Sequence, residues 1–453
     1  MESPMFLSRR EILKSGSAGF GYLAFAGLAN AQAAKEAPLA PKSSHFPGTA
    51  KHVIFLCMSG GPSHVDTFDY KPQLIRDHGK PGHYGGTLLS SPWKFRQRGQ
   101  SGLWISDLFP NVGEHADDLC LIRSMQCDQP AHPSAMTQMH TGTSRFIRPS
   151  LGAWTLYGLG TENDSVPGFI SLNPIAGNSR NYGSAFLPAI YGGTKVESGG
   201  QGNKESVRDI TNKSLSRKQQ RDQLDLLQML NREKLERDKV QPQVEGVIEA
   251  YELAFRMQDA MPAVMDTSKE TATTLAMYDV NSEETASFGL QCLLARRMVE
   301  SGVRFVEVTL GPWDQHTNLK SDHKARAVAC DKPIAALLQD LKQRDMLKDT
   351  LVIWGGEFGR SPEAQGSGSD GRNHNNKGYT TWMAGGGVKG GFSYGATDEY
   401  GYETVENKCH IHDWHATILH LLGLDHERLT YRYAGRDFRL TDVHGVVAKD
   451  ILA

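Results

Sequence analysis

Three apolar runs, each ending in a turn of glycines or polar residues, constrain the fold of this chain more than any other feature. They span residues 53–58 (VIFLCM), 304–310 (RFVEVTL) and 350–354 (TLVIW). Such near-continuous runs are typical of strands buried on both faces of a largely parallel sheet. Residues 244–255 and 327–341 repeat apolar side chains at helical spacing. The sequence therefore predicts an α/β fold, with a largely parallel central sheet flanked by helices.

The length and net charge of the chain limit the domain organisation and the partners that we expect. It has 453 residues, of which 22% are charged and 39% hydrophobic, and its net charge is -2. These values are typical of a globular protein. A nearly neutral net charge gives no reason to propose nucleic acid, so we expect no nucleic-acid partner. We expect one domain over residues 51–453, with a mostly helical, charge-rich insertion at about 205–300. The oligomeric state is not readable from the sequence.

The six cysteines form no CxxC pair, which leaves a zinc-ribbon site without support. Cys57 and Cys292 lie in apolar runs, and we predict that both are buried hydrophobic side chains. A disulfide pairing cannot be read from their spacing.

The N-terminus carries the pattern of a twin-arginine export signal. Arg9 and Arg10 precede a Gly- and Ala-rich apolar stretch at residues 18–28, and small residues at 29–33 offer cleavage sites. The stretch is too short and too glycine-rich to span a membrane securely. We therefore predict a signal peptide at residues 1–33, a linker at 34–50, the Tat translocon as a transient partner, and a periplasmic or extracellular location.

Polar clusters follow the predicted strands, and ligands of open α/β sheets bind beyond the carboxyl ends of strands. The segment SGGPSHVDTFD, residues 59–69, follows the first strand. Its Ser63 and His64 are candidate substrate-binding residues, and Asp66 lies beside them. The alternative is a turn whose Asp and Ser cap the next helix.

Asp314 and His316 follow the second strand and offer one carboxylate oxygen and one imidazole nitrogen. In an extended loop, alternate residues share a face, so both side chains can reach one ion. The alternative is a loop aspartate next to a solvated histidine. We favour a metal site at this position.

Two further clusters lie near the third strand. Glu357 and Arg360 follow it in GGEFGRSP, and Arg372 and His374 lie in GRNHNN. Glu357 and His374 are candidate metal ligands, whereas the guanidinium groups of Arg360 and Arg372 suit an anionic substrate. The alternatives are a surface ion pair for the first cluster and a polar surface loop for the second.

His132 and Ser134 lie at a predicted loop-to-helix start, in AHPSAMTQMHTG. Backbone N–H groups at a helix N-terminus favour anions, which makes this a candidate catalytic segment. The alternative is that Ser134 only caps the helix. The histidine-rich segment at 410–420 is predicted to be a structural helix packed on the sheet.

Several of these motifs together resemble the bacterial domain-of-unknown-function 1501 family, whose members are often exported by the twin-arginine route. The resemblance runs from about residue 52 to the C-terminus. Its most specific segments are GGPSHVDTFDYKP, YGSAFLPAIYGGT, LLARRMVESGVRFVEV, GGEFGRSP, WMAGGGVKGG and HATILHLLGLDHERLTYRYAGRDFRLTDVHG. The family is grouped with the alkaline phosphatase and sulfatase superfamily. The resemblance therefore implies an alkaline phosphatase-like three-layer sandwich.

The superfamily resemblance also implies roles for single residues. Glu357 and Asp314 fall at positions of its metal-binding aspartates, and His374 resembles its late metal histidine. Phe358 stands where a second metal histidine is usual. The formylglycine motif CxPSR of sulfatases is absent, because Ala131 or His132 takes the place of its cysteine. The aspartate expected after the first strand is replaced by Ser59–Gly60, and Asp66 is the candidate to substitute for it as a metal ligand.

From these patterns we expect an exported metal-dependent hydrolase of sulfate or phosphate esters, either small molecules or polysaccharides. Divalent ions, zinc, calcium or manganese, would be bound by Asp314, His316, Glu357 and His374, and water or Ser134 would attack. Arg360 and Arg372 would neutralise the anion. The rival hypothesis is an exported binding protein or pseudoenzyme that kept the scaffold but lost the nucleophile.

Overall fold

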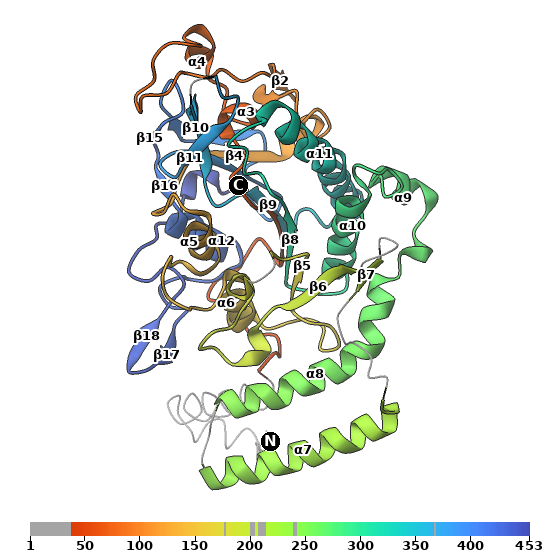
Figure 1. Ribbon diagram of the computed structural model, residues 1–453. Coiled ribbons are helices and arrows are strands. Elements are labelled where there is room, and N and C mark those ends of the chain that lie inside the picture. The colour runs from red at the N-terminus through yellow and green to blue at the C-terminus, as the bar shows by residue number, and fades with distance from the viewer. Residues whose placement is uncertain (1–37, 176–177, 200–203, 207–213, 239–241, 367) are drawn as a thin grey trace, which may run out of the picture.

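A computed structural model describes residues 38–175, 178–199, 204–206, 214–238, 242–366 and 368–453 (Figure 1). The predicted signal peptide at residues 1–33 lies outside these ranges, so export remains a prediction. Within the described part of the chain, no helix combines the length and apolar character that crossing a membrane requires.

The central sheet is built around the first predicted strand. β1 (His52–Met58) is buried at every residue and pairs in parallel with β8 (Phe305–Leu310) on one side and β9 (Thr350–Gly355) on the other. All three predicted apolar runs are therefore neighbouring central strands. Burial on both faces explains why these runs are largely apolar, although β8 also buries the polar side chains of Glu307 and Thr309.

The described residues of the sheet form ten strands in the order β13-β4-β12-β9-β1-β8-β5-β6-β7, with β16 also paired to β4. Only β12 and β7 run antiparallel to their neighbours in this part of the chain. The remaining sheet strands are β4 (Leu119–Gln126), β5 (Phe169–Leu172), β6 (Thr194–Gly199), β7 (Lys204–Ser206), β12 (Tyr379–Ala384), β13 (Phe392–Tyr394) and β16 (Cys409–His410).

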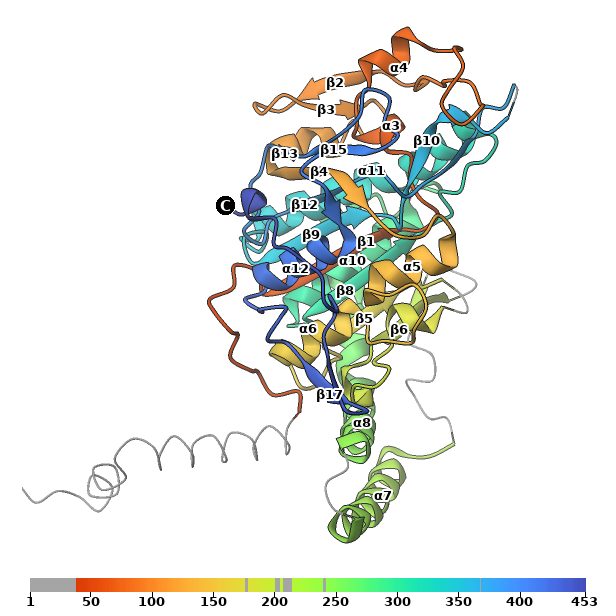
Figure 2. The same cartoon turned by 90° about the vertical axis from the view of Figure 1, so that its left-hand side faces the viewer.

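Helices cover both faces of this sheet (Figure 1). One layer contains α10 (Ala286–Glu300) and α11 (Leu319–Gln343). The other contains α5 (His132–Thr141), α6 (Leu151–Leu159) and α12 (Ile411–Leu421), which lie over the sheet in Figure 2. The predicted three-layer α/β sandwich with a largely parallel central sheet is confirmed.

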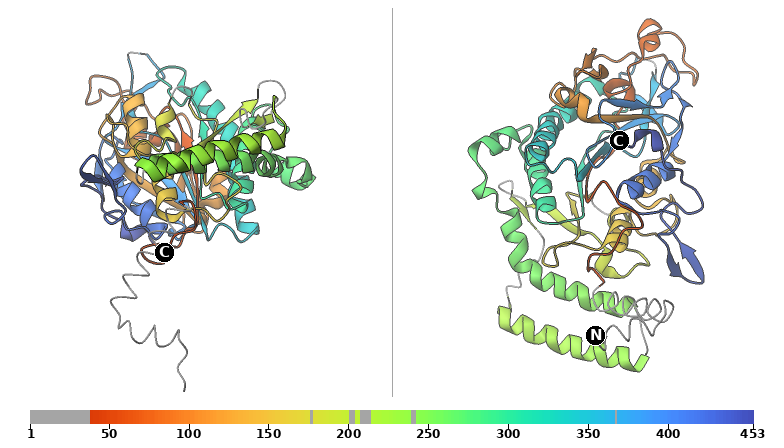
Figure 3. Two further views of the ribbon diagram at one scale, coloured as in Figure 1. Left: turned by 90° about the horizontal axis from the view of Figure 1, so that it is seen from below. Right: turned by 180° about the vertical axis from the view of Figure 1, so that it is seen from behind.

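Two long helices extend from the sandwich. α7 (Arg217–Asp238) and α8 (Pro242–Met265) pack side by side across one end of the sheet (Figure 3). α9 (Ala272–Met277) follows them, and α10 then packs against β8. The region predicted as a helical insertion thus contains α7 to α10, although α10 belongs to a covering layer. The boundaries of the insertion remain a prediction.

Small elements complete the described structure. They are α3 (His64–Thr67), α4 (Pro72–Arg76), β2 (Phe95–Arg98), β3 (Leu103–Ser106), β10 (Gly359–Ala364), β11 (Arg372–Asn375), β14 (Ala396–Thr397), β15 (Thr404–Glu406), β17 (Tyr431–Tyr433), β18 (Arg436–Phe438) and the 3-10 helices Val112–Asp118, Ser179–Asn181, Ala189–Tyr191, Thr267–Lys269 and Lys449–Ile451. The β10–β11 hairpin matters most here, because it follows β9 at the carboxyl edge of the sheet.

A buried ion pair fixes this hairpin to α3. Arg372 of β11 donates from Nε to Asp66 Oδ2 at 2.7 Å and from Nη2 to Asp66 Oδ1 at 3.1 Å. Both side chains are fully buried, and Ser63 Oγ also donates to Asp66. Burial alone would raise the pKa of Asp66, but the charge and hydrogen bonds of Arg372 outweigh burial and lower it. Asp66 is therefore a buried carboxylate with its counter-ion.

Removing Asp66 should strongly destabilise the protein. Asp66→Ala leaves the Arg372 guanidinium buried without its counter-ion, which costs about 3–5 kcal/mol in comparable cases. We expect urea denaturation to show a loss of this size in the free energy of unfolding. Asp437→Ala is the control, because its pair with Arg432 is solvent-exposed and should leave stability nearly unchanged. Equal effects of both substitutions would contradict this structural role.

Candidate metal centre

Four side chains from three distant segments meet at the carboxyl edge of the sheet. They are His132 at the start of α5, Asp314 and His316 in the loop after β8, and His374 on β11. One ligand atom from each lies within 4.8 Å of all the others. Asp314 Oδ1 lies 2.9 Å from His316 Nε2, 3.2 Å from His132 Nε2 and 3.5 Å from His374 Nε2. This group is a candidate metal site, and we refer to these four residues as the metal centre.

The far nitrogen of each imidazole is held by an oxygen. Nδ1 lies 2.6 Å from Glu357 Oε1 in His132, 2.5 Å from Gln365 Oε1 in His316 and 2.5 Å from the Pro130 carbonyl in His374. The oxygen of a peptide, of a side-chain amide and of a carboxylate accepts hydrogen bonds, so with these partners Nδ1 is the donor in each ring. Each Nε2 lone pair is then free for a cation. This is the arrangement of ligand histidines in metalloproteins.

The close approach of the Nε2 atoms would suit a cation bound between them. His316 Nε2 and His374 Nε2 lie only 2.9 Å apart, next to the Asp314 carboxylate. If both rings are neutral, the Nε2 lone pairs of His316 and His374 and the Asp314 carboxylate face one another and repel. A cation shared by the three groups would relieve this repulsion. Three imidazole nitrogens and one carboxylate oxygen fit the preferences of zinc. Calcium prefers an all-oxygen shell, so this donor set disfavours the calcium expectation.

The charges around Asp314 keep it ionised. Burial would raise its pKa, but the hydrogen bond and charge of Arg360, followed by His132 and His316, lower the pKa of Asp314 to about 2. About a third of the side chains of Asp314 and His316 is exposed, at 35% and 34%. Solvent and a substrate can therefore reach the metal centre from this side.

Glu357 lies behind the metal centre instead of within its four-residue cluster. Its side chain is fully buried, and its carboxylate accepts the Gly60 backbone N–H at 3.0 and 3.1 Å as well as the His132 ring proton. The carboxylate predicted to bind metal thus orients a ligand histidine. A side chain at Gly60 would place Cβ 2.5 Å from the Trp313 nitrogen, so only glycine permits this close approach.

Arg360 is buried inside the site and is already engaged. Its guanidinium donates to Asp314 Oδ1 at 2.7 Å and to the Gly61 carbonyl at 2.9 Å, and it also contacts the Gly60 carbonyl. Only 1% of the side chain is exposed. In this structure Arg360 holds Asp314 to the glycine turn after β1, and it does not face a substrate as we expected.

Other predicted site residues make their contacts outside the metal centre. Asp66 and Arg372 neutralise one another in the ion pair above, which leaves neither for a metal or an anionic substrate. Ser63 donates to that same carboxylate, and His64 is buried with Nε2 at 2.9 Å from the Gly401 carbonyl. Ser134 is half-buried on the first turn of α5 and donates to the Ala131 carbonyl at 3.1 Å. These contacts correct our expectations for Asp66, Arg372, Ser63 and His64, whereas the role of Ser134 remains a prediction.

The sequence did not identify Gln365 or the Pro130 carbonyl as partners of the ligand histidines. A backbone carbonyl has no sequence signature. The one signal that the sequence offers for Gln365 is its position directly after β10. Phe358 packs its ring against His132 and His374, at centroid distances of 4.7 and 4.6 Å. Phe358 therefore borders both imidazole rings without offering a ligand atom of its own.

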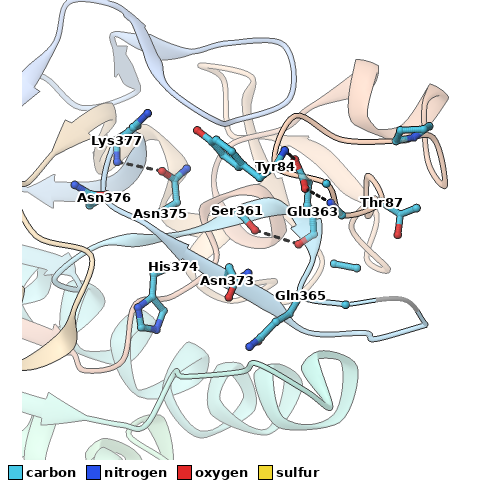
Figure 4. A pocket seen from close by; sticks show the side chains of 15 residues that line it. Tyr84, Thr87, Ser361, Glu363, Gln365, Asn373, His374, Asn375, Asn376 and Lys377 are labelled. Atoms are coloured by element: carbon cyan, nitrogen blue, oxygen red, sulfur yellow. Dashed lines mark hydrogen bonds between the residues drawn. The ribbon is translucent and has the colours of Figure 1, made fainter.

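Two clefts border the metal centre. The first, of about 720 Å³, has His374 and Gln365 along one edge and Tyr84 and Lys377 along the opposite edge (Figure 4). We call it the tyrosine cleft. The second, of about 490 Å³, is the arginine cleft. It is lined by Ser59, Glu357, His132, Pro133, Met136, Thr137, Ile175, Asn178 and Arg180. Neither Ser59 nor Arg180 was singled out as a substrate contact from the sequence.

Solved structures that match this chain at low identity include sulfatases and related hydrolases. The PsFucS1 sulfatase from Pseudoalteromonas sp. is 13% identical, with 89% of this chain and 72% of that chain covered and a TM-score of 0.37. A protein in the alkaline phosphatase superfamily from Vibrio parahaemolyticus is 11% identical, over 85% and 69% of the two chains, with a TM-score of 0.35. The phosphonate monoester hydrolase SpPMH from Silicibacter pomeroyi is 10% identical, over 82% and 73%, with a TM-score of 0.34.

All three TM-scores lie below 0.5, so the fold assignment rests on the strand order and helix layers described above. No curated protein matches the chain. A family model matches it over residues 50–452, which is nearly the whole described domain. The chain therefore belongs to the family described as "Protein of unknown function (DUF1501)".

Proposed function

We propose that this protein is a metal-dependent hydrolase of sulfate or phosphate esters. The observation that carries the proposal is the convergence of three Nε2 atoms and one carboxylate oxygen, with the histidine Nδ1 atoms held by oxygen acceptors. A divalent ion bound there supplies a Lewis acid that polarises the ester oxygen and lowers the pKa of water. The ester class is the one implied by the superfamily resemblance of Asp314 and His374.

The protein residues around this ion have separate tasks. His132, Asp314, His316 and His374 would bind it. Glu357 fixes the ring of His132 through Nδ1, and Arg360 holds Asp314 in place. Fixed ligands lower the reorganisation needed when a substrate binds, because the charges are already oriented.

Two features near the metal centre suit an anionic substrate. Arg180 is exposed and lines the arginine cleft together with His132. α5 begins at His132, and no side chain caps its first turn. The positive end of the helix dipole therefore lies at the same cleft, where free backbone N–H groups favour an anion. An ester oxyanion in this cleft would contact both features.

Export belongs to the same proposal. The Arg9–Arg10 pattern and the small residues at 29–33 support a Tat-exported protein that acts in the periplasm or outside the cell on small-molecule or polysaccharide esters.

Loss of two ligand histidines should remove both metal and activity. We expect His316→Ala/His374→Ala to contain one metal equivalent less than the wild-type protein by elemental analysis, and to lose turnover of aryl sulfate and aryl phosphate panels. His444→Ala is the matched control, since its imidazole is exposed and lies outside the metal centre. Metal bound without turnover of either panel by the wild-type protein would favour the rival reading, a non-catalytic binding protein.

Metal affinity should rise with pH. Burial lowers the pKa of His132, but the hydrogen bond and charge of Glu357, and then the charge of Asp314, outweigh it and raise the pKa above its usual value of 6.5. Below that pKa, a proton occupies Nε2 and must leave before a metal binds. Chelator-competition titrations with zinc should therefore show affinity increasing with pH and levelling off above the raised pKa.

Glu357→Gln tests the cause of this pH dependence. The variant removes the charge that raises the pKa of His132, so the rise in affinity should move to lower pH. Its metal affinity at high pH should fall by about 10–100-fold, as is typical when a partner of a ligand histidine is lost. An affinity that stays constant across the neutral pH range in the wild-type protein would contradict the assignment of His132 as a ligand.

Arg180 should set the affinity for an anionic substrate. A hydrogen bond to a charged group contributes about 1.5–3 kcal/mol, so Arg180→Met should raise KM for an aryl sulfate or aryl phosphate by about 10-fold or more. Arg180→Lys should recover part of this loss because it keeps the charge. Arg432→Met, at an exposed arginine on β17, is the control. An unchanged KM in Arg180→Met would exclude this role.

A further inference from the structure

A second group of metal-ligand side chains lies inside the sandwich, between the sheet and α5. Cys57 of β1, Glu307 of β8 and His140 of α5 place one sulfur, one oxygen and one nitrogen within 4.8 Å of one another. Their exposed fractions are 0%, 1% and 3%. No residue is shared with the metal centre, although α5 carries a ligand of both. His132 and His140 are separated by about 12 Å along the helix axis.

The hydrogen bonds of His140 leave one nitrogen directed at this group. Its Nδ1 lies 2.9 Å from the Met136 carbonyl, which can only accept, so Nδ1 carries a proton. Its Nε2 lies 3.2 Å from Glu307 Oε2. Neither atom has a hydrogen-bond partner among the described residues, because their approach is not aligned for one. A hydrogen bond between His140 Nε2 and Glu307 Oε2 therefore has poor geometry. A metal ion placed to one side of the line that joins these two atoms can contact both of them.

The surrounding groups complete a polar environment for a cation. The other carboxylate oxygen of Glu307 lies 3.3 Å from Thr309 Oγ1 and 3.5 Å from Ser171 Oγ. These hydroxyls orient the carboxylate, as partners of ligand carboxylates do in metal sites. They are also the nearby polar groups that would hold a water as a fourth ligand.

We propose that Cys57, His140 and Glu307 bind a second, buried divalent ion of the zinc class, with a structural role. Sulfur, imidazole and carboxylate donors are the set that zinc prefers. One thiolate, one carboxylate, one neutral imidazole and a divalent ion sum to zero charge, which a fully buried site requires. Binding releases two protons: the Cys57 thiol gives up its S–H proton as the metal–sulfur bond forms, and the ion-paired His140 gives up its Nε2 proton so that the lone pair can bind the metal.

Without a cation the same three groups would be a thiol beside an ion pair. Burial, followed by the charges of Glu307 and Glu357, raises the pKa of Cys57 well above its usual range. Burial lowers the pKa of His140, but the negative charge of Glu307 nearby outweighs burial and raises that pKa. A bound metal would have the opposite effect on the pKa of Cys57, since a thiol that coordinates a metal loses its proton. The ionisation of Cys57 thus distinguishes the two states.

The ion would fix the position of α5. Cys57 and Glu307 lie on neighbouring parallel strands at the centre of the sheet, and His140 lies on the helix that packs over them. A metal bond to each element would pin the helix to β1 and β8. Since His132 begins the same helix, the buried ion would act as a positioning element for the metal centre.

Cobalt substitution separates this site from the metal centre. The metal centre offers only nitrogen and oxygen ligands, so a cobalt–thiolate charge-transfer absorption reports the buried site alone. We expect full-length protein, stripped with a chelator and reloaded with Co²⁺, to show this absorption. Cys57→Ser should lose it, whereas Cys292→Ser should keep it. Cys292 is an equally buried thiol that belongs to no metal-ligand group in the described part of the chain.

His316→Ala/His374→Ala, which lacks two ligands of the metal centre, should retain the absorption. This variant therefore tests the buried metal site separately from the proposed hydrolase activity. If Cys57→Ser does not fold, X-ray absorption at the zinc edge of the native wild-type protein decides, because a sulfur scatterer at about 2.3 Å is expected. Absence of both the cobalt–thiolate absorption and the sulfur scatterer in folded wild-type protein would overturn the proposal and leave a buried ion pair.

Discussion

The parallel pairing of β1 with β8 and β9 is the constraint on which the rest of the structure depends. Parallel strands end at the same edge of a sheet, so the loops that follow them are brought together whatever their distance in the chain. The glycine turn after β1, the Asp314 loop after β8 and the Glu357 turn after β9 meet in this way. β4 runs in the same direction, which places the start of α5, and so His132, at that edge.

Acceptor oxygens determine what this edge can bind. The Pro130 carbonyl and the Glu357 carboxylate each accept from Nδ1 of a histidine, which turns its Nε2 toward Asp314. Glu357 is itself held by the Gly60 backbone, and Arg360 links that same turn to Asp314. The metal centre is therefore supported from behind by two buried side chains, Glu357 and Arg360, and at its rim by the carbonyl of the exposed Pro130. Such support preorganises a site and excludes alternative ring orientations.

Much of this arrangement could be predicted from local sequence. Apolar runs at residues 53–58, 304–310 and 350–354 predicted the central strands, because strands covered on both faces lack polar alternation. Asp314, His316 and His374 were predicted as ligands from their polar clusters and the resemblance, and the structure brings them together. The roles of Asp66, Arg360 and Arg372 could not be predicted in the same way. A buried charge takes whichever partner the fold places beside it, and sequence spacing does not reveal that partner.

The sequence by itself determined the α/β class, the edge of the sheet where polar groups gather and the residue types available there. Hydrophobic periodicity and the polarity of strand ends are local properties, so they can be read from the sequence without knowledge of the fold. Only the tertiary structure decided that Glu357 stands behind His132, that Arg372 neutralises Asp66, and that Cys57 meets His140 and Glu307 inside the sandwich. These pairings join residues far apart in the chain, and their chemistry depends on distances of a few ångströms that packing alone sets.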